Sequence, residues 1–260
     1  MRFQIIKSDK RFEFLNDIFM NNGIGSSLIE RVDDISCKNL ILPIPVTRDG
    51  VKISGTEIKI KDLTSHIQEN STIFCGKKEL LNSEITKFKN IKILDYSDNE
   101  LFLLKNAELT SYGILKILFE QSKKAPNKLK ILISGFGRIG KILSQMLLNL
   151  NIQVHVLGHS LKDKFWIKKI GAKELKSLEN LRFDFIINTA PSMIFSEDII
   201  KNIKFETSFI EVASKNGIDK NACKKFEIKY QLSLGIPGKY FPKESAEVIK
   251  ESIFNLIGEK

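Results

Sequence analysis

A glycine-rich hexapeptide carries the strongest chemical signal in the sequence. It reads Gly135, Phe136, Gly137, Arg138, Ile139, Gly140. In this G-x-G-x-x-G pattern the first glycine permits a tight turn, the second lets a pyrophosphate approach the backbone, and the third lets a helix pack closely on a strand. Amide groups at the start of that helix then face the phosphates. All six residues are therefore candidate contacts of a bound dinucleotide.

The segments on either side of the hexapeptide are of the type that this chemistry requires. Residues 129–134 form a continuous apolar run typical of a buried strand. The apolar residues that follow fall on one face of a predicted helix: Ile139, Leu143, Met146, Leu147 and Leu150. A glycine pattern alone is a weak signal, but this strand and helix context favours a dinucleotide site. A structural glycine turn in another α/β fold is the alternative.

The next predicted strand, residues 153–157, bears on the choice between NAD and NADP. NAD enzymes usually carry Asp or Glu at the end of this strand, where it accepts hydrogen bonds from the adenosine ribose. This sequence has Gly158 there, followed by His159, Ser160 and Lys162 as candidate ligands of a 2′-phosphate. We therefore predict NADP, with NAD the less favoured cofactor. The alternative for Lys162 is that it lies on a helix face exposed to solvent.

A further strand is predicted over residues 183–188, and a polar turn follows it. The turn residues are Asn188, Thr189, Ala190 and Pro191. Because parallel strands end at one common edge of their sheet, these residues are expected beside the nicotinamide ribose. A plain turn uses the same residue types and remains the alternative.

Short apolar runs alternate with amphipathic segments along the whole chain, which predicts βα units and parallel sheets. Further strands are expected at 3–6, 39–44, 71–75, 91–94, 208–212 and 227–231. Further helices are expected at 10–20, 106–121, 165–170 and 244–257, the last of them ended by Gly258. The polar stretch 122–127 interrupts this pattern and is the expected domain boundary.

The predicted fold class is α/β, with two Rossmann-like domains of parallel sheets. Residues 1–105 form an N-terminal substrate domain, 106–127 a connecting helix and linker, 128–241 the dinucleotide-binding Rossmann domain, and 242–260 a C-terminal helix that packs back on the first domain. A cleft between the domains is expected to hold cofactor and substrate, with hinge closure excluding water.

Composition excludes several classes of function. The formal net charge is +10, but the lysines are scattered among acidic residues, so no nucleic-acid partner is expected. No run approaches the roughly 20 apolar residues that span a bilayer, so no membrane partner and a cytoplasmic location are expected. The three cysteines, Cys37, Cys75 and Cys223, lie far apart, and we expect neither a disulfide nor a metal site.

Several motifs resemble the A subunits of dipicolinate synthase from spore-forming bacteria. The most specific are Asn-Thr-x-Pro-Ser-Met-Ile at 188–194 and Gly-x-Pro-Gly-x-x-x-Pro-Lys at 235–243. The other matching segments are Leu42 to Pro45 with Thr47, Arg48 and Gly50; Ile73 to Gly76; Asn106 with Thr110 and Gly113; and Ala213-Ser214-Lys215. Two departures are Lys7-Ser8-Asp9, where relatives are glycine-rich, and Tyr112, where relatives carry an acidic residue.

The resemblance implies an oxidoreductase that oxidises dihydrodipicolinate to dipicolinate, pyridine-2,6-dicarboxylate, with hydride transfer to NADP. It also implies a role in sporulation, a place in the mother cell and, as partner, a flavoprotein-like B subunit. A substrate with two carboxylates requires cationic side chains. Arg48 is the first candidate catalytic and substrate-binding residue, because its guanidinium can hold a carboxylate through two parallel hydrogen bonds. Lys243 is the second candidate catalytic residue and the first candidate for the other carboxylate, followed by Lys215 or Lys239.

The remaining site residues follow from the same resemblance. Thr47, Asn106 and Thr110 are expected to hydrogen-bond the substrate, and helix capping is the alternative for Asn106. The residues expected to complete the cofactor site are Ala213, Ser214, Gly235 and Pro237.

Three other functions stay open. A 2-hydroxyacid dehydrogenase needs a catalytic histidine in a late loop, and none of His66, His155 and His159 lies there. A shikimate-type dehydrogenase has a similar Asn-Thr-x-Pro segment, but its lysine and aspartate motif is not found. A non-catalytic, NADP-binding subunit of a two-subunit complex is the third. The sequence names no general base and leaves the oligomeric state open, a homo-oligomer included.

Overall fold

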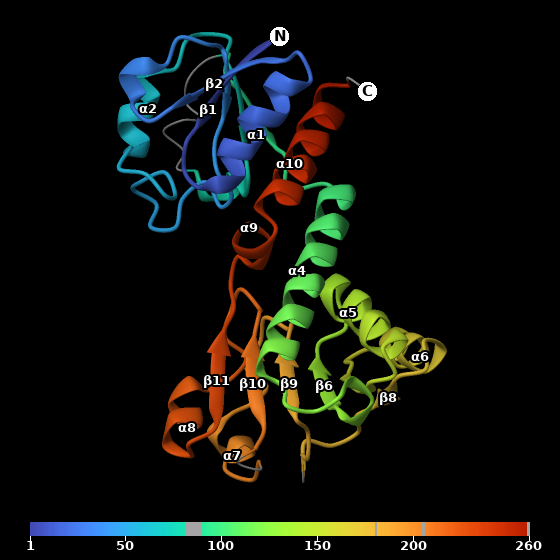
Figure 1. Ribbon diagram of the computed structural model, residues 1–260. Helices are drawn as coiled ribbons and strands as arrows, with labels where there is room; N and C mark the ends of the chain where they lie inside the picture. The colour runs from blue at the N-terminus through green and yellow to red at the C-terminus, as the bar shows by residue number, and fades with distance from the viewer. Residues whose placement is uncertain (82–89, 180, 204–205, 259–260) are drawn as a thin grey trace. The chain divides into compact units, whose positions relative to one another are not determined.

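The computed structural model describes residues 1–81, 90–179, 181–203 and 206–258 and divides the chain into two compact units (Figure 1). The first unit comprises Met1–Asn106 with Pro237–Lys260, and the second comprises Ala107–Ile236. The division falls inside helix α4 (Glu100–Gln121), and not at 122–127 where composition placed it. The reason is that α4 is one continuous helix whose first residues belong to one unit and whose remainder belongs to the other.

The first unit contains a parallel sheet of five strands. They are β1 (Arg2–Ile6), β2 (Gly25–Ile29), β3 (Asn39–Ile41), β4 (Thr72–Cys75) and β5 (Lys92–Asp95). Their order is β2-β1-β3-β4-β5, and every pairing is parallel. This is the flavodoxin-like order, in which ligands bind beyond the strand ends where the order reverses, here between β1 and β3. The pattern did not predict β2, because two serines interrupt its apolar run.

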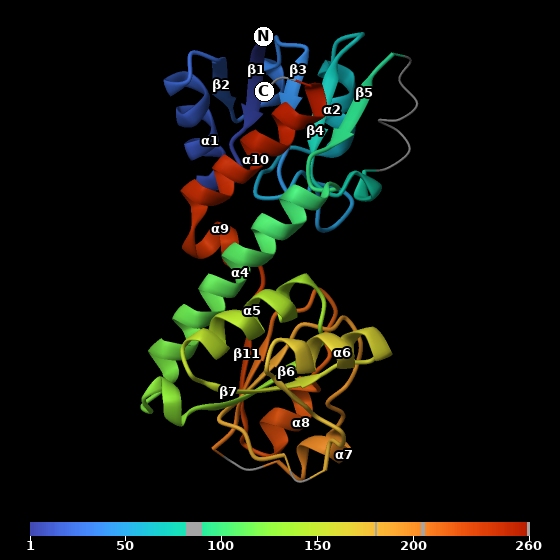
Figure 2. The same cartoon turned by 90° about the vertical axis from the view of Figure 1, so that its right-hand side faces the viewer.

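Two long helices cover part of this sheet and pack on each other: α1 (Lys10–Asn21) and α10 (Pro242–Ile257). Phe254 of α10 lies against Phe3 and Phe19, with ring centroids 6.3 and 5.7 Å away. Gly258 adopts a left-handed φ of 74° and ends α10, as the sequence predicted. Figure 2 shows α10 alongside α1. The short helix α2 (Ile60–His66) precedes β4.

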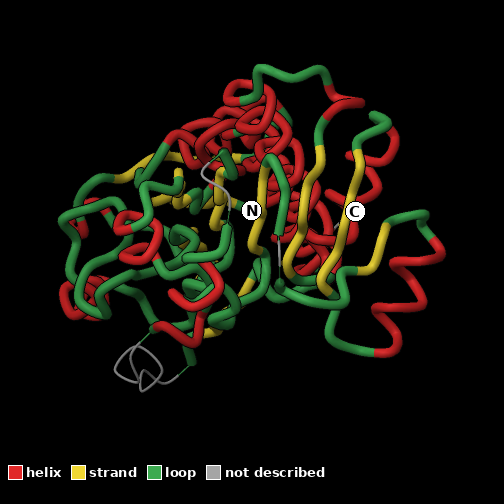
Figure 3. Tube along the Cα trace, turned by 90° about the horizontal axis from the view of Figure 1, so that it is seen from below, coloured by secondary structure: helices red, strands yellow, loops and turns green. Residues whose placement is uncertain are grey.

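The second unit contains a parallel sheet of six strands. They are β6 (Lys130–Ser134), β7 (Gln153–Leu157), β8 (Lys173–Glu174), β9 (Phe185–Asn188), β10 (Ser208–Glu211) and β11 (Lys229–Leu232). Their order, β11-β10-β9-β6-β7-β8, is that of the Rossmann fold, with the reversal between β6 and β9. The helices between the strands are α5 (Arg138–Asn149), α6 (Leu161–Lys169), α7 (Glu197–Ile200) and α8 (Lys220–Lys225), and α9 (Ile236–Tyr240) follows β11. Strands and flanking helices are distinguished by colour in Figure 3. The predicted α/β class with parallel sheets is confirmed.

Two helices begin earlier than the sequence pattern indicated. Helix α4 starts at Glu100, where the Asn99 side chain accepts a hydrogen bond from the Phe102 amide at 2.8 Å. Asn106 therefore lies inside the helix, and the capping alternative for it is wrong. Helix α6 starts at Leu161, because Ser160 and Asp163 form a reciprocal capping box.

The described helices and residue clusters carry neither a membrane span nor a metal site. None of the helices in the described ranges is both long and apolar enough to cross a bilayer. Within the same ranges no group of three or more His, Cys, Asp or Glu side chains is arranged to hold a metal ion. The free thiols of Cys75 and Cys223 are buried.

His155 is expected to make the stability of the second unit dependent on pH. Burial, helped by the nearby charges of Lys130 and Lys173, lowers the pKa of His155 to about 4. Its Nδ1 is buried without a hydrogen-bond partner among the described residues, and its ring packs edge-on against Phe183 at 5.1 Å. The unfolded chain therefore binds a proton at a higher pH than the folded chain does. The stability present above the usual histidine pKa is lost as pH falls towards 4.

We expect His155→Phe to reduce this pH dependence. Phenylalanine keeps the ring contact with Phe183 and removes the titration, so denaturant unfolding should lose less stability between about pH 7 and pH 5 in the variant than in the wild type. Identical losses in the two proteins would show that His155 is not the group responsible.

Candidate functional site

The first glycine of the hexapeptide occupies a position that only glycine fits. Gly135 follows β6 with a φ of 94°, in the region that side chains disfavour. A Cβ at this position would lie 2.7 Å from Thr189 Oγ1 and 3.0 Å from the Ala190 nitrogen. The turn after β6 is therefore tight and packs directly against the turn after β9.

The other two glycines shape the start of α5. Gly137 is the N-cap residue of α5, no side chain caps this helix end, and a Cβ added at Gly137 would meet nothing within 4 Å. A Cβ at Gly140 would lie 2.3 Å from the Gly135 carbonyl oxygen, so helix and strand approach as closely as backbone allows. The first amides of a helix have no partner within the helix, so open space beside its N-terminus is what a pyrophosphate requires, and these residues fit a dinucleotide.

The turn after β9 is fixed to the glycine loop. The Thr189 amide donates a hydrogen bond to the Ser134 carbonyl at 2.8 Å, and its hydroxyl donates to the same oxygen at 3.0 Å. Asn188 is fully buried, and its amide group donates to the Ala190 carbonyl at 2.9 Å and to Glu211 at 2.8 Å. The Asn188 side chain thus holds the turn in shape. Ala190 is buried and Pro191 is exposed.

Glu211, at the end of β10, is the central residue of this edge and was missed by the sequence analysis. Its carboxylate is fully buried and accepts hydrogen bonds from Asn188 and from the Ala213 and Gly217 amides. A glutamate that follows the apolar pair Phe209-Ile210, just before the predicted site residues Ala213 and Ser214, was the available signal. Ser214 and its neighbour Lys215 are exposed.

The turn after β7 is organised by Asp163. Its carboxylate accepts hydrogen bonds from the His159 and Ser160 amides at 3.3 and 3.2 Å, and the Ser160 hydroxyl accepts one from the Asp163 amide at 3.0 Å. Burial acts to raise the pKa of Asp163, but the hydrogen bonds from Ser160 and His159 and the charge of Lys141 lower it overall. Ser160 therefore caps α6, and His159 is exposed.

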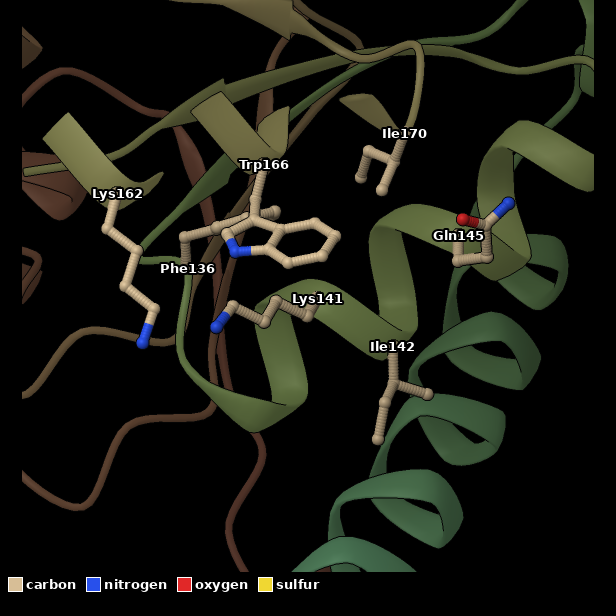
Figure 4. A pocket seen from close by; sticks show the side chains of 7 residues that line it. All are labelled: Phe136, Lys141, Ile142, Gln145, Lys162, Trp166 and Ile170. Carbon is tan, nitrogen blue, oxygen red and sulfur yellow. The ribbon is translucent and has the colours of Figure 1, made fainter. Parts of the chain in front are cut away.

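A cavity of about 530 Å³ lies between α5 and α6 beside the glycine loop (Figure 4). Its lining residues are Phe136, Lys141, Ile142, Gln145, Lys162, Trp166 and Ile170. Phe136 of the hexapeptide thus forms part of the cavity wall, and Lys141 and Lys162 both line it. The cavity combines two cationic residues with Trp166, which is 42% exposed. Lys141, which follows the hexapeptide, was not predicted as a site residue.

The Arg48 loop of the first unit follows β3, beside the reversal of strand order. The Thr47 hydroxyl accepts a hydrogen bond from the Gly50 amide at 3.0 Å and donates one to Asp49 at 3.2 Å, and Thr47 is only 2% exposed. Thr47 therefore holds the loop, and its predicted contact with a substrate does not fit this burial. Arg48 itself is exposed, and no described carboxylate forms an ion pair with it.

Arg11 is a second arginine at this edge, and sequence reasoning missed it. Its Nε and Nη2 donate to the two carboxylate oxygens of Asp9 at 3.0 and 2.7 Å, and Nη2 also donates to the Ile44 carbonyl at 3.1 Å. A Cβ at Gly238 would lie 2.8 Å from Arg11 Nε. The second glycine of the Gly-Ile-Pro-Gly motif therefore leaves room for this guanidinium.

The remaining predicted site residues are distributed over both units. Asn106 and Thr110 lie four residues apart on α4, so they share a helix face, and both have interaction partners in the structure. Lys243 is exposed in the first turn of α10. Lys239 lies over the ring of Tyr240 at 5.1 Å. Gly235 has a φ of 65°, and Pro237 is buried.

Comparison with known proteins identifies relatives of the whole chain, although no known family profile matches it. The chain is 23% identical over 255 residues to the A subunit of dipicolinate synthase from Bacillus subtilis, in an alignment that covers 92% of this chain and 85% of the relative. The crystal structure of the corresponding A subunit from Bacillus halodurans superimposes with a TM-score of 0.87 at 19% identity, over 100% of this chain and 98% of that one. The resemblance seen in the sequence is confirmed.

The fold is also shared with a larger group of dehydrogenases. The NAD-complexed D-isomer specific 2-hydroxyacid dehydrogenase from Lactobacillus delbrueckii ssp. bulgaricus superimposes with a TM-score of 0.60 at 11% identity, over 100% of this chain and 98% of that one. At this identity the similarity concerns the fold alone, and it agrees with the two Rossmann-like sheets described above.

Proposed function

We propose that this chain is an NADP-dependent oxidoreductase that oxidises dihydrodipicolinate to dipicolinate, as the dehydrogenase component of a dipicolinate synthase. The observation that carries the proposal is the glycine loop, in which Gly137 leaves open space at the uncapped N-terminus of α5. The similarity of almost the whole chain to the A subunit of the Bacillus subtilis synthase supports the choice of substrate. We further propose a cytoplasmic location and, as partner, a second subunit.

In the proposed reaction the substrate loses a hydride and a proton and becomes aromatic. NADP, when bound, supplies the nicotinamide ring that accepts the hydride. The chain's own residues bind the nucleotide and the substrate and orient them. The amides at the start of α5 hold the pyrophosphate, Arg48 holds one substrate carboxylate through its planar fork, and Lys243, or Lys215 in its place, holds the other. Because aromatisation is favourable, water or a weak base takes the proton.

We propose that Lys162 and Lys141 select NADP over NAD. Both lysines line the cavity beside Phe136, and Lys141 is close enough to Asp163 to lower the pKa of that carboxyl group. Asp163 in turn fixes the His159 and Ser160 amides at the end of β7, the strand end at which the adenosine ribose binds in this fold. Two ammonium groups at this position complement a 2′-phosphate.

Alanine at Lys141 and at Lys162 is expected to weaken NADP binding and leave NAD binding unchanged. A hydrogen bond to a charged group contributes about 1.5–3 kcal/mol, so each loss corresponds to roughly 10- to 100-fold in Kd. Competitive titrations with both nucleotides measure these changes in Kd. Lys164→Ala is the matched control, because Lys164 lies on the same helix but pairs with Glu174 at 3.3 Å. An unchanged ratio of NADP to NAD affinity in both variants would remove the assignment.

The proposed activity is tested by mixing the purified chain with NADP⁺ and freshly generated dihydrodipicolinate and following nucleotide reduction. We expect reduction by the chain alone. Reduction only after a second subunit is added would favour the non-catalytic, NADP-binding role. Binding of nucleotide without reduction in either mixture would contradict the proposed substrate.

A 2-hydroxyacid dehydrogenase is the second candidate, and one contact bears on it. His66 Nε2 lies 3.2 Å from an Asp33 carboxylate oxygen. His66 is therefore a histidine held by a carboxylate, as that enzyme class requires. This pair sits on α2 and the segment before β3, early in the chain, and not in the late loop of that enzyme class. D-lactate with NAD⁺ or NADP⁺ should therefore give no reaction, and turnover abolished by His66→Gln would favour this second candidate.

A further inference from the structure

We propose that Glu211 is the positioning residue for the nicotinamide half of the nucleotide site. Its buried carboxylate ties together the two turns that follow β9 and β10. The inference rests on the proposed function only in requiring that a dinucleotide binds at the glycine loop. It assigns a role to a residue that contacts no ligand itself and acts through Asn188, Ala213 and Gly217.

Both oxygens of the carboxylate accept hydrogen bonds, and the donors come from both turns. Oε1 accepts from the Asn188 side-chain amide at 2.8 Å and from the Ala213 backbone amide at 3.0 Å, and Oε2 accepts from the Gly217 amide at 2.8 Å. Glu211 is fully buried, and no lysine, arginine or histidine in the described ranges forms an ion pair with it. Burying a carboxylate is costly unless hydrogen bonds replace water. The three donors must therefore stay in place together.

Gly217 packs tightly against the turn that follows β9. A Cβ at this position would lie 2.3 Å from Asn188 Nδ2 and 2.6 Å from the Ser192 carbonyl oxygen. The Gly217 carbonyl also accepts hydrogen bonds from the Ile194 and Phe195 amides, each at 2.9 Å. Residues 188–195 and 213–217 thus form one block around the carboxylate, with no room for a side chain at Gly217.

The position of this block in the sheet identifies which half of the nucleotide it serves. In the strand order β11-β10-β9-β6-β7-β8, the dinucleotide lies across the reversal between β6 and β9. The adenosine half belongs over β7, where His159 and Ser160 lie, so the nicotinamide half belongs over β9 and β10. The block meets the glycine loop through Thr189 and Gly135. Its shape therefore sets the surface against which the nicotinamide ribose rests.

The test compares two ligands on the Glu211→Gln variant. Glutamine has nearly the same shape but turns one acceptor into a donor, which opposes the backbone and amide donors around it. NADPH spans both halves of the site, whereas 2′,5′-ADP occupies the adenosine half alone. We expect the Kd for NADPH to rise about tenfold, a loss of about 1.4 kcal/mol, with the Kd for 2′,5′-ADP unchanged. Trp166, the single tryptophan, lies beside the glycine loop and reports binding by fluorescence.

Two further variants separate positioning from general stability. Gly217→Ala disturbs the same block through Asn188 and should reproduce the selective loss for NADPH. Thr207→Val is the matched control, because Thr207 precedes β10 at the opposite edge of the sheet and its buried hydroxyl donates to the Phe183 carbonyl at 2.7 Å. The Thr207→Val variant should be less stable than the wild type and should bind NADPH and 2′,5′-ADP with unchanged affinity.

Each outcome decides a different claim. Equal weakening of NADPH and 2′,5′-ADP by Glu211→Gln, or wild-type affinity for both in Glu211→Gln and Gly217→Ala, overturns the positioning role while leaving the nucleotide site intact. A wild-type chain that binds neither ligand overturns the proposed function, and the role of Glu211 with it.

Discussion

Replacing Arg48 by alanine is expected to lower kcat/KM for dihydrodipicolinate by about 30-fold or more, with NADP affinity unchanged. Truncating one partner of a buried, hydrogen-bonded charge pair, which Arg48 becomes once substrate covers it, costs about 2–5 kcal/mol, which corresponds to a loss of roughly 30- to several thousand-fold. Arg48 is exposed in a loop whose shape is held by Thr47 and Asp49, so the fold does not depend on its side chain. Steady-state kinetics and a nucleotide titration of the same preparation measure both quantities.

Two variants sharpen the Arg48 experiment. Arg48→Lys keeps the charge and loses the planar fork, so it should restore only part of the activity. Arg31→Ala removes another exposed arginine of the first unit, one that pairs with Asp33, and should change neither parameter. If turnover by Arg48→Ala matches the wild type, Arg48 has no part in holding the substrate.

Gly137→Asp is expected to weaken NADPH binding by about 100-fold or more without lowering the stability of the fold. A Cβ at Gly137 meets nothing within 4 Å, and its φ of −74° suits any residue. Aspartate is among the preferred N-cap residues, so unfolding free energy should stay the same or increase. Its carboxylate, however, takes the amides that the pyrophosphate requires and repels the phosphates, a combined penalty of at least ~2.7 kcal/mol.

The Gly137→Asn variant separates charge from size. Asparagine also caps helices and has the same shape as aspartate, so it should preserve stability and weaken NADPH binding less. Thermal unfolding and fluorescence titration of both variants give the comparison. Wild-type affinity in Gly137→Asp would show that the pyrophosphate does not lie at this helix end.

The sequence predicted the elements of the site better than their contacts. The strand at 153–157, the hexapeptide between a strand and a helix, and the end of the last helix at Gly258 all follow from local patterns: periodicity, glycine spacing and capping. Strand β2 and the first turns of α4 were not predicted. Two serines interrupt the apolar run of β2, and residues 101–104 of α4 are all apolar, so they show no helical period after the Asn99 cap.

Residues whose role depends on distant partners could not be found in this way. Glu211 acts by binding Asn188, 23 positions earlier, and Arg11 by reaching Ile44, 33 positions later. Lys141 and Lys162 meet at one cavity only because α5 and α6 are neighbours on the sheet. Thr47 was predicted to contact substrate from the resemblance, and Asn188 to contact the cofactor from its place after a strand. In the structure the side chains of both residues form hydrogen bonds within the loops that carry them.

Titration of the wild-type chain with NADPH, followed by calorimetry and by Trp166 fluorescence, tests the central claim most directly. We predict saturable binding of one nucleotide per chain, tighter for NADPH than for NADH, and weakened by about 100-fold or more in Gly137→Asp. A chain that shows no affinity for either nucleotide, alone or with its proposed partner, would contradict the assignment of the glycine loop and the oxidoreductase function built on it.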